Sequence, residues 1–125
     1  MNKELDFLAS AKRTILMERD AVNDLITHLD SNFETACMLA LECKGRVIVT
    51  GMGKSGHIGN KIAATLASTG TPSFFVHPGE ASHGDLGMFT PDDIVIALSN
   101  SGETSEVLSI LPLIKRMKAP LISIT

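Results

Sequence analysis

The chain has 125 residues, enough for one ordinary domain, and its 44% apolar and 20% charged residues predict a buried core and exclude intrinsic disorder. The formal net charge of −3 and the lack of Trp and Tyr give no electrostatic or stacking basis for binding nucleic acid or an anionic membrane surface. No apolar run approaches the roughly 20 residues of a membrane span. The charged start of the sequence is unlike a signal peptide. We therefore expect a cytoplasmic protein whose two cysteines are reduced.

The first part of the chain predicts helices. Apolar residues recur at helical spacing from Leu5 to Leu29, opposite a charged face, which indicates one long amphipathic helix. Residues 30–32 interrupt this pattern and are suited to cap a second helix from Phe33 to about Cys43. We assign residues 1–32 to an N-terminal helix that packs on the domain or on a neighbouring subunit, and residues 33–125 to the domain itself.

From Arg46 onward, apolar strands alternate with helices. Strands are predicted at residues 46–50, 73–76, 93–98 and 121–125, with helices at 57–69 and at 104–117, the second kinked by Pro112. Because the strands are apolar throughout, the pattern predicts an α/β fold, a doubly wound parallel sheet of about four strands with helices on both faces. The chain ends in or just after the last strand, which normally needs a further covering element, so we expect a domain that is incomplete at its C-terminus.

A glycine-rich turn, Gly51-Met52-Gly53-Lys54-Ser55-Gly56, follows the first strand. Its G-x-G-x-x-G pattern is typical of dinucleotide binding, but no acidic residue that would hold a ribose follows the second strand. A P-loop is excluded, because the glycine that it requires five residues before Gly53 is Ile48. The turn offers backbone amides, Lys54 and Ser55 to an anion such as phosphate. The alternative is a tight turn with a solvated lysine.

A second polar turn, Ser99-Asn100-Ser101-Gly102-Glu103-Thr104, follows the third strand. The hydroxyl groups of Ser99, Ser101 and Thr104 lead into a helix, where they and the first helical amides suit a small phosphate monoester. Alternatively, Ser101 or Thr104 only caps the helix. Since the carboxyl ends of parallel strands share one edge of the sheet, the two turns together indicate a phosphate site.

Between the turns, residues 77–85 hold two histidines and two acids, which suits acid–base catalysis or metal binding. His77 and His83 are six residues apart, which matches no recognised zinc spacing, and ordinary surface histidines are the alternative. Glu103 and Glu106 are three residues apart and are predicted to share the first turn of a helix, where carboxylates interact favourably with the helix dipole. From there either carboxylate can reach a ligand at the strand ends.

Three segments, residues 51–57, 64–72 and 75–88, resemble the D-arabinose 5-phosphate isomerases, which are enzymes of the sugar isomerase (SIS) domain family. The similarity extends over residues 33–125 and implies the flavodoxin-like, three-layer fold of SIS domains. It also implies interconversion of D-ribulose 5-phosphate and D-arabinose 5-phosphate through an enediol, a reaction that feeds Kdo synthesis for lipopolysaccharide or capsule. The resemblance implies a homotetramer and no cofactor.

The resemblance further implies roles for single residues. Lys54, His83 and Glu106 match catalytically important positions, with Glu106 or His83 as the base and Lys54 stabilising the enediolate. Positions that contact the sugar or its phosphate are matched by Ser55, Gly70, Thr71, His83, Ser99, Ser101 and Thr104. His77 matches a position associated with zinc, which is inhibitory in this family rather than catalytic.

Other functions fit the same fold. SIS domains of transcriptional regulators bind a sugar phosphate without converting it, but such a module is expected to lack Lys54 and His83 or to carry a DNA-binding segment. A dinucleotide-binding domain is the remaining alternative. The family's domain continues beyond the position of residue 125 with a further acid and a further histidine, and many members add CBS domains. We therefore expect this chain alone to be catalytically incomplete.

Overall fold

The computed structural model of the protein describes residues 4–82 and 85–125. The chain divides into two compact units, Met1–Thr35 and Ala36–Thr125, and each is described by itself. Among the helices of the described residues, none combines the length and the apolar character needed to cross a membrane.

The N-terminal unit is helical. Helix α1 (Phe7–Asp24) begins after Asp6, whose carboxylate accepts a hydrogen bond from the Ala9 backbone N–H at 2.9 Å. A 3-10 turn, η1 (Leu25–His28), follows, and α2 (Ser31–Glu42) leads into the second unit. The helix predicted over residues 5–29 therefore starts two residues later than expected, at its capping aspartate, and tightens into a 3-10 turn at its end.

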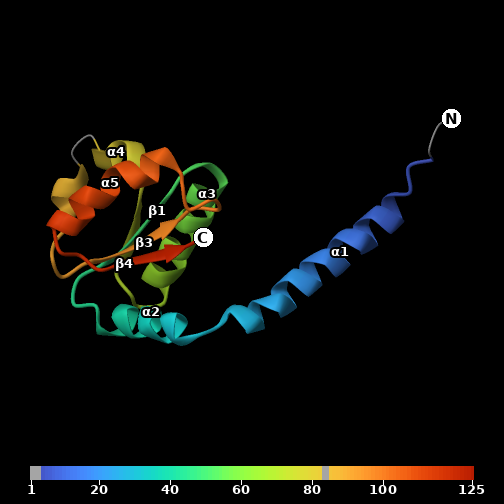
Figure 1. Ribbon diagram of the computed structural model, residues 1–125, viewed down its shortest axis with the longest axis horizontal. Coiled ribbons are helices and arrows are strands. Elements are labelled where there is room, and N and C mark those ends of the chain that lie inside the picture. Colours follow the sequence, from blue (N-terminus) through green and yellow to red (C-terminus); the bar gives the residue numbers. More distant parts are fainter. Residues whose placement is uncertain (1–3, 83–84) are drawn as a thin grey trace. The chain divides into compact units, whose positions relative to one another are not determined.

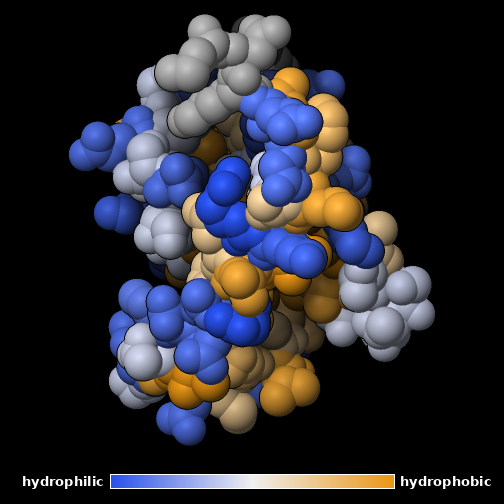
Figure 2. Space-filling view, turned by 90° about the vertical axis from the view of Figure 1, so that its right-hand side faces the viewer, coloured by the Kyte–Doolittle hydropathy of each residue, from blue (hydrophilic) through white to orange (hydrophobic). Residues whose placement is uncertain are grey.

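None of the residues of α1, η1 and α2, all of which the structure describes, is buried. Figure 2 shows hydrophobic residues at the surface beside hydrophilic ones. The large apolar side chains exposed in the N-terminal unit are Leu5, Phe7, Leu8, Ile15, Leu16, Met17, Val22, Leu25, Ile26, Leu29 and Phe33. Since most helical stability in proteins comes from packing of an apolar face, this unit requires a partner surface.

The second unit is built on one sheet of four strands (Figure 1), which are β1 (Val47–Gly51), β2 (Ser73–Val76), β3 (Ile94–Leu98) and β4 (Leu121–Ile124). Their order is β2-β1-β3-β4, and every neighbouring pair is parallel. The predicted parallel sheet is confirmed, with strand ends that differ by one residue from the prediction at 46, 93 and 125.

Helices cover both faces of this sheet. They are α3 (Gly53–Ser68) on one face, and α4 (Pro78–Ser82) and α5 (Ser105–Arg116) on the other, with a 3-10 turn, η2 (Asp85–Met88), before β3. Side chains of β1 alternate between two hydrophobic clusters, Ile48 in the cluster with α4 and α5 and Val47 and Val49 in the cluster with α3. All three are fully buried. The doubly wound, three-layer arrangement is confirmed.

Helix α3 begins at Gly53, four residues earlier than the sequence predicts, so the predicted start at residue 57 is wrong. A Cβ atom on Gly56 would lie 2.7 Å from the carbonyl oxygen of Gly51, which is closer than van der Waals contact allows. The missing side chain lets the first turn of α3 pack directly on the end of β1. Lys54 and Ser55 consequently lie in a helix rather than in a loop.

Candidate functional site

The carboxyl ends of β1 and β3 form a topological switch point. The chain passes from β1 to β2 on one side of the sheet and then returns to β3 on the other, so α3 and α5 cover opposite faces. Gly51 pairs with Leu98, and the two loops that follow therefore leave the sheet next to each other and then diverge. In open α/β sheets this is where ligands bind. Both polar turns predicted from the sequence flank this point.

The loop after β3 is a compact cluster of hydroxyl groups. The Oγ atom of the buried Ser99 lies 2.7 Å from Thr104 Oγ1 and accepts a hydrogen bond from the Gly102 N–H at 3.0 Å. Ser101 Oγ accepts a hydrogen bond from the Glu103 N–H at 3.0 Å. Thr104 occupies the N-cap position of α5, but its side chain makes no capping hydrogen bond. The Thr104 hydroxyl therefore faces the loop, which weakens the alternative that it only caps the helix.

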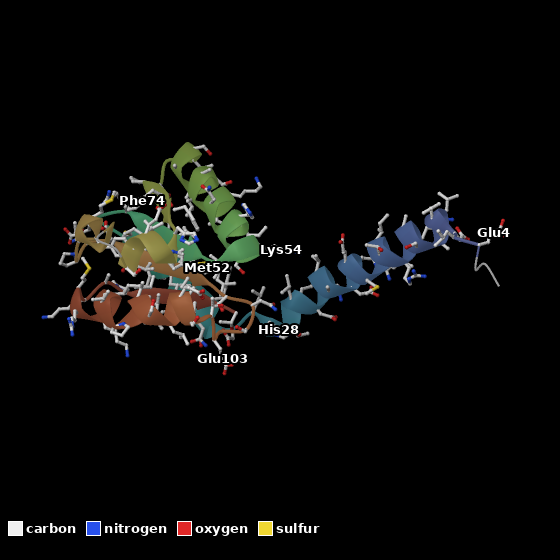
Figure 3. All side chains as sticks on the ribbon, turned by 90° about the horizontal axis from the view of Figure 1, so that it is seen from above. Glu4, His28, Met52, Lys54, Phe74 and Glu103 are labelled. Carbon is white, nitrogen blue, oxygen red and sulfur yellow. The ribbon has the colours of Figure 1, made fainter. Side chains whose placement is uncertain are left out.

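The first turn of α3 brings a cation to the same edge of the sheet. Its N-cap residue, Met52, has no side-chain oxygen to bond the first amides of the helix. Lys54 is exposed and Ser55 is half-buried in this turn. Figure 3 shows Lys54 and Met52 at the same end of the domain as Glu103, which belongs to the loop after β3. An amide-rich helix start with a lysine facing a hydroxyl cluster suits a phosphate group.

Glu106 and His77 add titratable groups at this edge. Glu106 lies in the first turn of α5 and is exposed, and His77 directly follows β2. The pKa of the Glu106 carboxyl is lowered by a hydrogen bond from its own backbone N–H, by the Ser105 hydroxyl at 3.0 Å and by the charge of His77. Glu103 precedes the helix, so the prediction that both glutamates share its first turn is wrong for Glu103.

The structure does not bring Gly70 and Thr71 to this edge. Helix α3 runs back along the sheet, so the segment after it lies where the strands begin, and the carbonyl of the adjoining Pro72 accepts a hydrogen bond from the Val47 N–H at 2.9 Å. Within this chain, the two residues are therefore separated from the hydroxyl cluster by the length of the sheet.

The two predicted histidines have different outcomes. His83 lies outside the described residues. The Nδ1 atom of His77 accepts a hydrogen bond from the Gly79 N–H at 3.1 Å, which leaves Nε2 as the position for a metal ion. In the ranges 4–82 and 85–125, no three His, Cys, Asp or Glu residues gather as a metal site would require. The inhibitory zinc at His77 stays a prediction.

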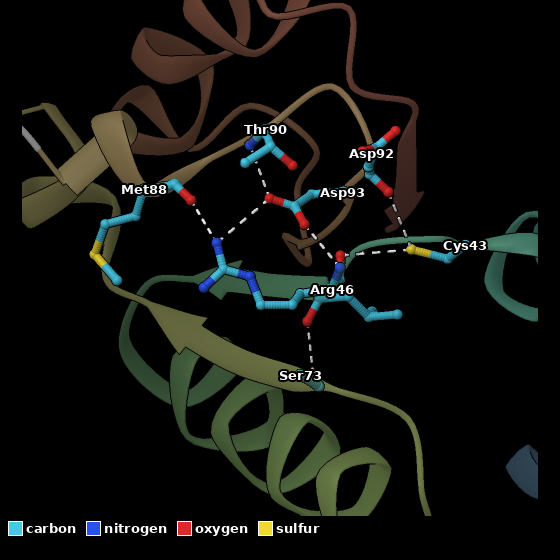
Figure 4. A network of polar contacts seen from close by, with 8 residues as sticks. Cys43, Arg46, Ser73, Met88, Thr90, Asp92 and Asp93 are labelled. Carbon is cyan, nitrogen blue, oxygen red and sulfur yellow. Dashed lines mark hydrogen bonds and ion pairs between the residues drawn. The ribbon is translucent and has the colours of Figure 1, made fainter.

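Sequence reasoning missed two buried polar groups that hold the sheet. Thr50, near the end of β1, donates its hydroxyl hydrogen bond to the Val76 carbonyl at 2.7 Å. Asp93, just before β3, accepts hydrogen bonds from the backbone N–H groups of Arg46 at 2.7 Å and Thr90 at 2.8 Å and faces the Arg46 guanidinium at 3.6 Å (Figure 4). The only signal in the sequence is a polar residue at the boundary of an apolar strand.

Comparison with known proteins identifies relatives of the whole chain. A family model described as SIS domain matches residues 40–125. Arabinose 5-phosphate isomerase KdsD of Pseudomonas aeruginosa is 65% identical over 125 residues, which are 100% of this chain and 38% of that protein. The protein of the same name from Escherichia coli K12 is 58% identical over 120 residues, which are 96% of this chain and 37% of that protein.

A solved structure, that of E. coli CFT073 c3406 in complex with arabinose 5-phosphate, matches with a TM-score of 0.89 at 50% identity and covers 98% of this chain and 65% of that one. The chain thus spans 37–38% of the length of the two KdsD relatives. The SIS model covers most of the sheet-bearing unit, including both loops of the switch point. The chain therefore belongs to the SIS domain family.

Proposed function

We propose that the protein is an aldose–ketose isomerase that interconverts D-ribulose 5-phosphate and D-arabinose 5-phosphate in the cytoplasm and so supplies Kdo synthesis for lipopolysaccharide or capsule. The observation that carries the proposal is the hydroxyl cluster of Ser99, Ser101 and Thr104 opposite Lys54 at the switch point. The names of the KdsD relatives support the choice of substrate.

The residues divide into a group that holds the phosphate and a group that acts on the carbons. In the proposal, the hydroxyl cluster and Ser55 bind the phosphate and fix the sugar in place. Isomerisation moves a proton between C1 and C2, so a base must stand over the sugar. We assign that proton transfer to Glu106, with His83 as the alternative base, while the Lys54 ammonium stabilises the negative enediolate oxygen.

The complete protein, incubated with D-ribulose 5-phosphate, is expected to form D-arabinose 5-phosphate. Unphosphorylated D-ribulose is expected to remain unconverted at the same concentration, because the hydroxyl cluster then has no ligand. Binding of D-ribulose 5-phosphate without turnover would support the sensor function instead, and equal turnover of both sugars would contradict the assignment of the phosphate site.

The pH dependence of kcat/KM distinguishes the two bases. If Glu106 is the base, it must be ionised, and its lowered pKa keeps it ionised above the ordinary carboxyl range. We expect kcat/KM to be lost only as pH falls through that lowered pKa, with no acidic limb near the imidazole value of about 6.5. Steady-state kinetics across the pH range checks this.

Glu103→Gln serves as the control for Glu106→Gln, because Glu103 is an exposed glutamate that lies just outside the helix. Glu106→Gln should abolish most of the turnover, and Glu103→Gln should retain it. An acidic limb near pH 6.5 would assign the base to His83 rather than Glu106.

The exposed apolar side chains of α1 and η1 support a homo-oligomeric protein, as the tetramer of the resemblance implies. Replacing Leu16 and Ile26 by glutamate places charges among these side chains and is expected to lower the molar mass of the complete protein measured by light scattering. Replacing the exposed Lys12 and Glu18 of α1 by alanine is the control and should leave the mass unchanged. A monomeric wild-type protein would contradict this expectation.

A further inference from the structure

Thr50 joins the ends of the two strands that lead into the candidate site. It is the penultimate residue of β1, only 1% exposed, and its Oγ1 donates a hydrogen bond to the Val76 carbonyl oxygen at 2.7 Å. Val76 is the last residue of β2, and its carbonyl belongs to the peptide bond with His77. The Thr50 hydroxyl therefore fixes the plane of the peptide at which the chain leaves the sheet.

The segment beyond this peptide depends on that orientation. His77 receives the Gly79 N–H on Nδ1, and α4 starts at Pro78, which is buried. Ala81, on the same short helix, is 1% exposed and packs in the cluster that contains Ile110 of α5. A rotation of the Val76–His77 peptide would consequently move α4 and His77 relative to α5, which carries Glu106.

The other side of the contact leads to Lys54. Thr50 is followed directly by Gly51, and the tight approach of Gly56 to the Gly51 carbonyl ties α3 to the end of β1. One buried hydroxyl thus links the strand end that positions Lys54 with the strand end that positions His77.

We propose that Thr50 is a positioning residue for the isomerase site: its hydroxyl sets the position of residues 77–82 relative to Lys54 and Glu106. This inference rests on the proposed function for its kinetic consequence. The structural part, that the hydroxyl holds residues 77–82 in place, can be measured independently of any activity.

The sheet contains a matched control for this contact. Ser73, at the start of β2, donates its hydroxyl hydrogen bond to the Val47 carbonyl at 2.6 Å. It joins the same two strands through the same kind of bond, but at the opposite edge of the sheet (Figure 4). Loss of either bond weakens the pairing of β1 and β2, whereas only loss of the Thr50 bond should disturb the site.

The test compares Thr50→Val, Thr50→Ser and Ser73→Ala in the complete protein. Thr50→Val keeps the shape and removes the hydroxyl, and we expect kcat to fall by about 10- to 100-fold because a displaced catalytic group loses its geometry. KM should change less than about threefold, since the hydroxyl cluster that holds the phosphate is untouched. Thr50→Ser and Ser73→Ala should both keep kcat within about threefold of wild type.

Hydrogen exchange provides the readout that does not depend on activity. The amides of residues 78–82 should exchange faster in Thr50→Val than in Thr50→Ser or Ser73→Ala. Thr50→Ala is made in parallel, so that a variant without the hydroxyl is available if valine prevents folding. Unchanged kcat and exchange in the variants without the hydroxyl, or an equal loss in Ser73→Ala, would overturn the proposal. A wild-type protein without isomerase activity would refute the proposed function, and the exchange comparison would still decide whether Thr50 holds the segment.

Discussion

Replacing Lys54 by alanine is expected to lower kcat for the interconversion of the two pentose phosphates by about 10²- to 10³-fold, the usual effect of removing a group that stabilises a developing oxyanion. Lys54 is the cation in the first turn of α3, and the exposure of its side chain leaves it accessible to a ligand at the switch point. Because the ammonium interacts with charge that develops during the reaction, kcat should fall more than KM rises. Steady-state kinetics of the complete protein measures both.

Lys61→Ala is the control for this prediction, because Lys61 is an exposed lysine about two turns further along α3. Removing it changes the net charge by the same amount without touching the first turn. A Lys54→Ala protein with turnover close to wild type, or an equal loss in Lys61→Ala, would remove Lys54 from the mechanism.

Replacing Asp93 by asparagine is expected to lower the free energy of unfolding by about 3 kcal/mol, because the buried carboxylate accepts hydrogen bonds from two backbone N–H groups. An asparagine oxygen can accept one of them, while its NH₂ group would face the second donor. The site loses the charge that faces Arg46 as well. Urea denaturation at neutral pH measures the difference.

The effect of Asp93→Asn should depend on pH. Burial raises the pKa of the Asp93 carboxyl, but the hydrogen bonds from Arg46 and Thr90 and the Arg46 charge outweigh it, so the folded-state pKa is lowered. A lowered pKa contributes stability that is present above the ordinary carboxyl value of about 3.9 and is lost as pH falls through the folded-state value. The difference between wild type and variant should therefore shrink in acid.

The exposed neighbour Asp92 provides the control, since the contacts that it makes in this network use its backbone carbonyl. Asp92→Asn should leave the free energy of unfolding nearly unchanged. If both variants were equally stable at neutral pH, the Asp93 carboxylate would not be the group that holds β3 to the start of β1.

The fold could be predicted from the sequence because its elements rest on local patterns. The apolar runs of β1 and β3 alternate between two helix-covered faces, and such runs identify buried parallel strands directly. The start of α3 could not be predicted in this way, since Gly53 and Gly56 usually indicate a turn. Their place in a helix depends on the close approach of Gly56 to the Gly51 carbonyl, which is a tertiary contact.

The site could be predicted only where one loop carries several groups. Ser99, Ser101 and Thr104 are neighbours in sequence, and the structure gathers them in one loop. Thr50 escaped notice because its partner, Val76, is on another strand and is reached only through the register of β1 with β2. Order along the chain therefore reveals single loops, whereas contacts between strands require the sheet.

One measurement tests the central claim, that this switch-point site isomerises a pentose phosphate. The complete protein is incubated separately with D-ribulose 5-phosphate and with D-arabinose 5-phosphate, and proton NMR follows both reactions. The site proposed here predicts that both reach the same mixture of the two sugar phosphates, and that Lys54→Ala slows the approach from either side. Two unchanged sugar phosphates in the presence of folded wild-type protein would contradict it.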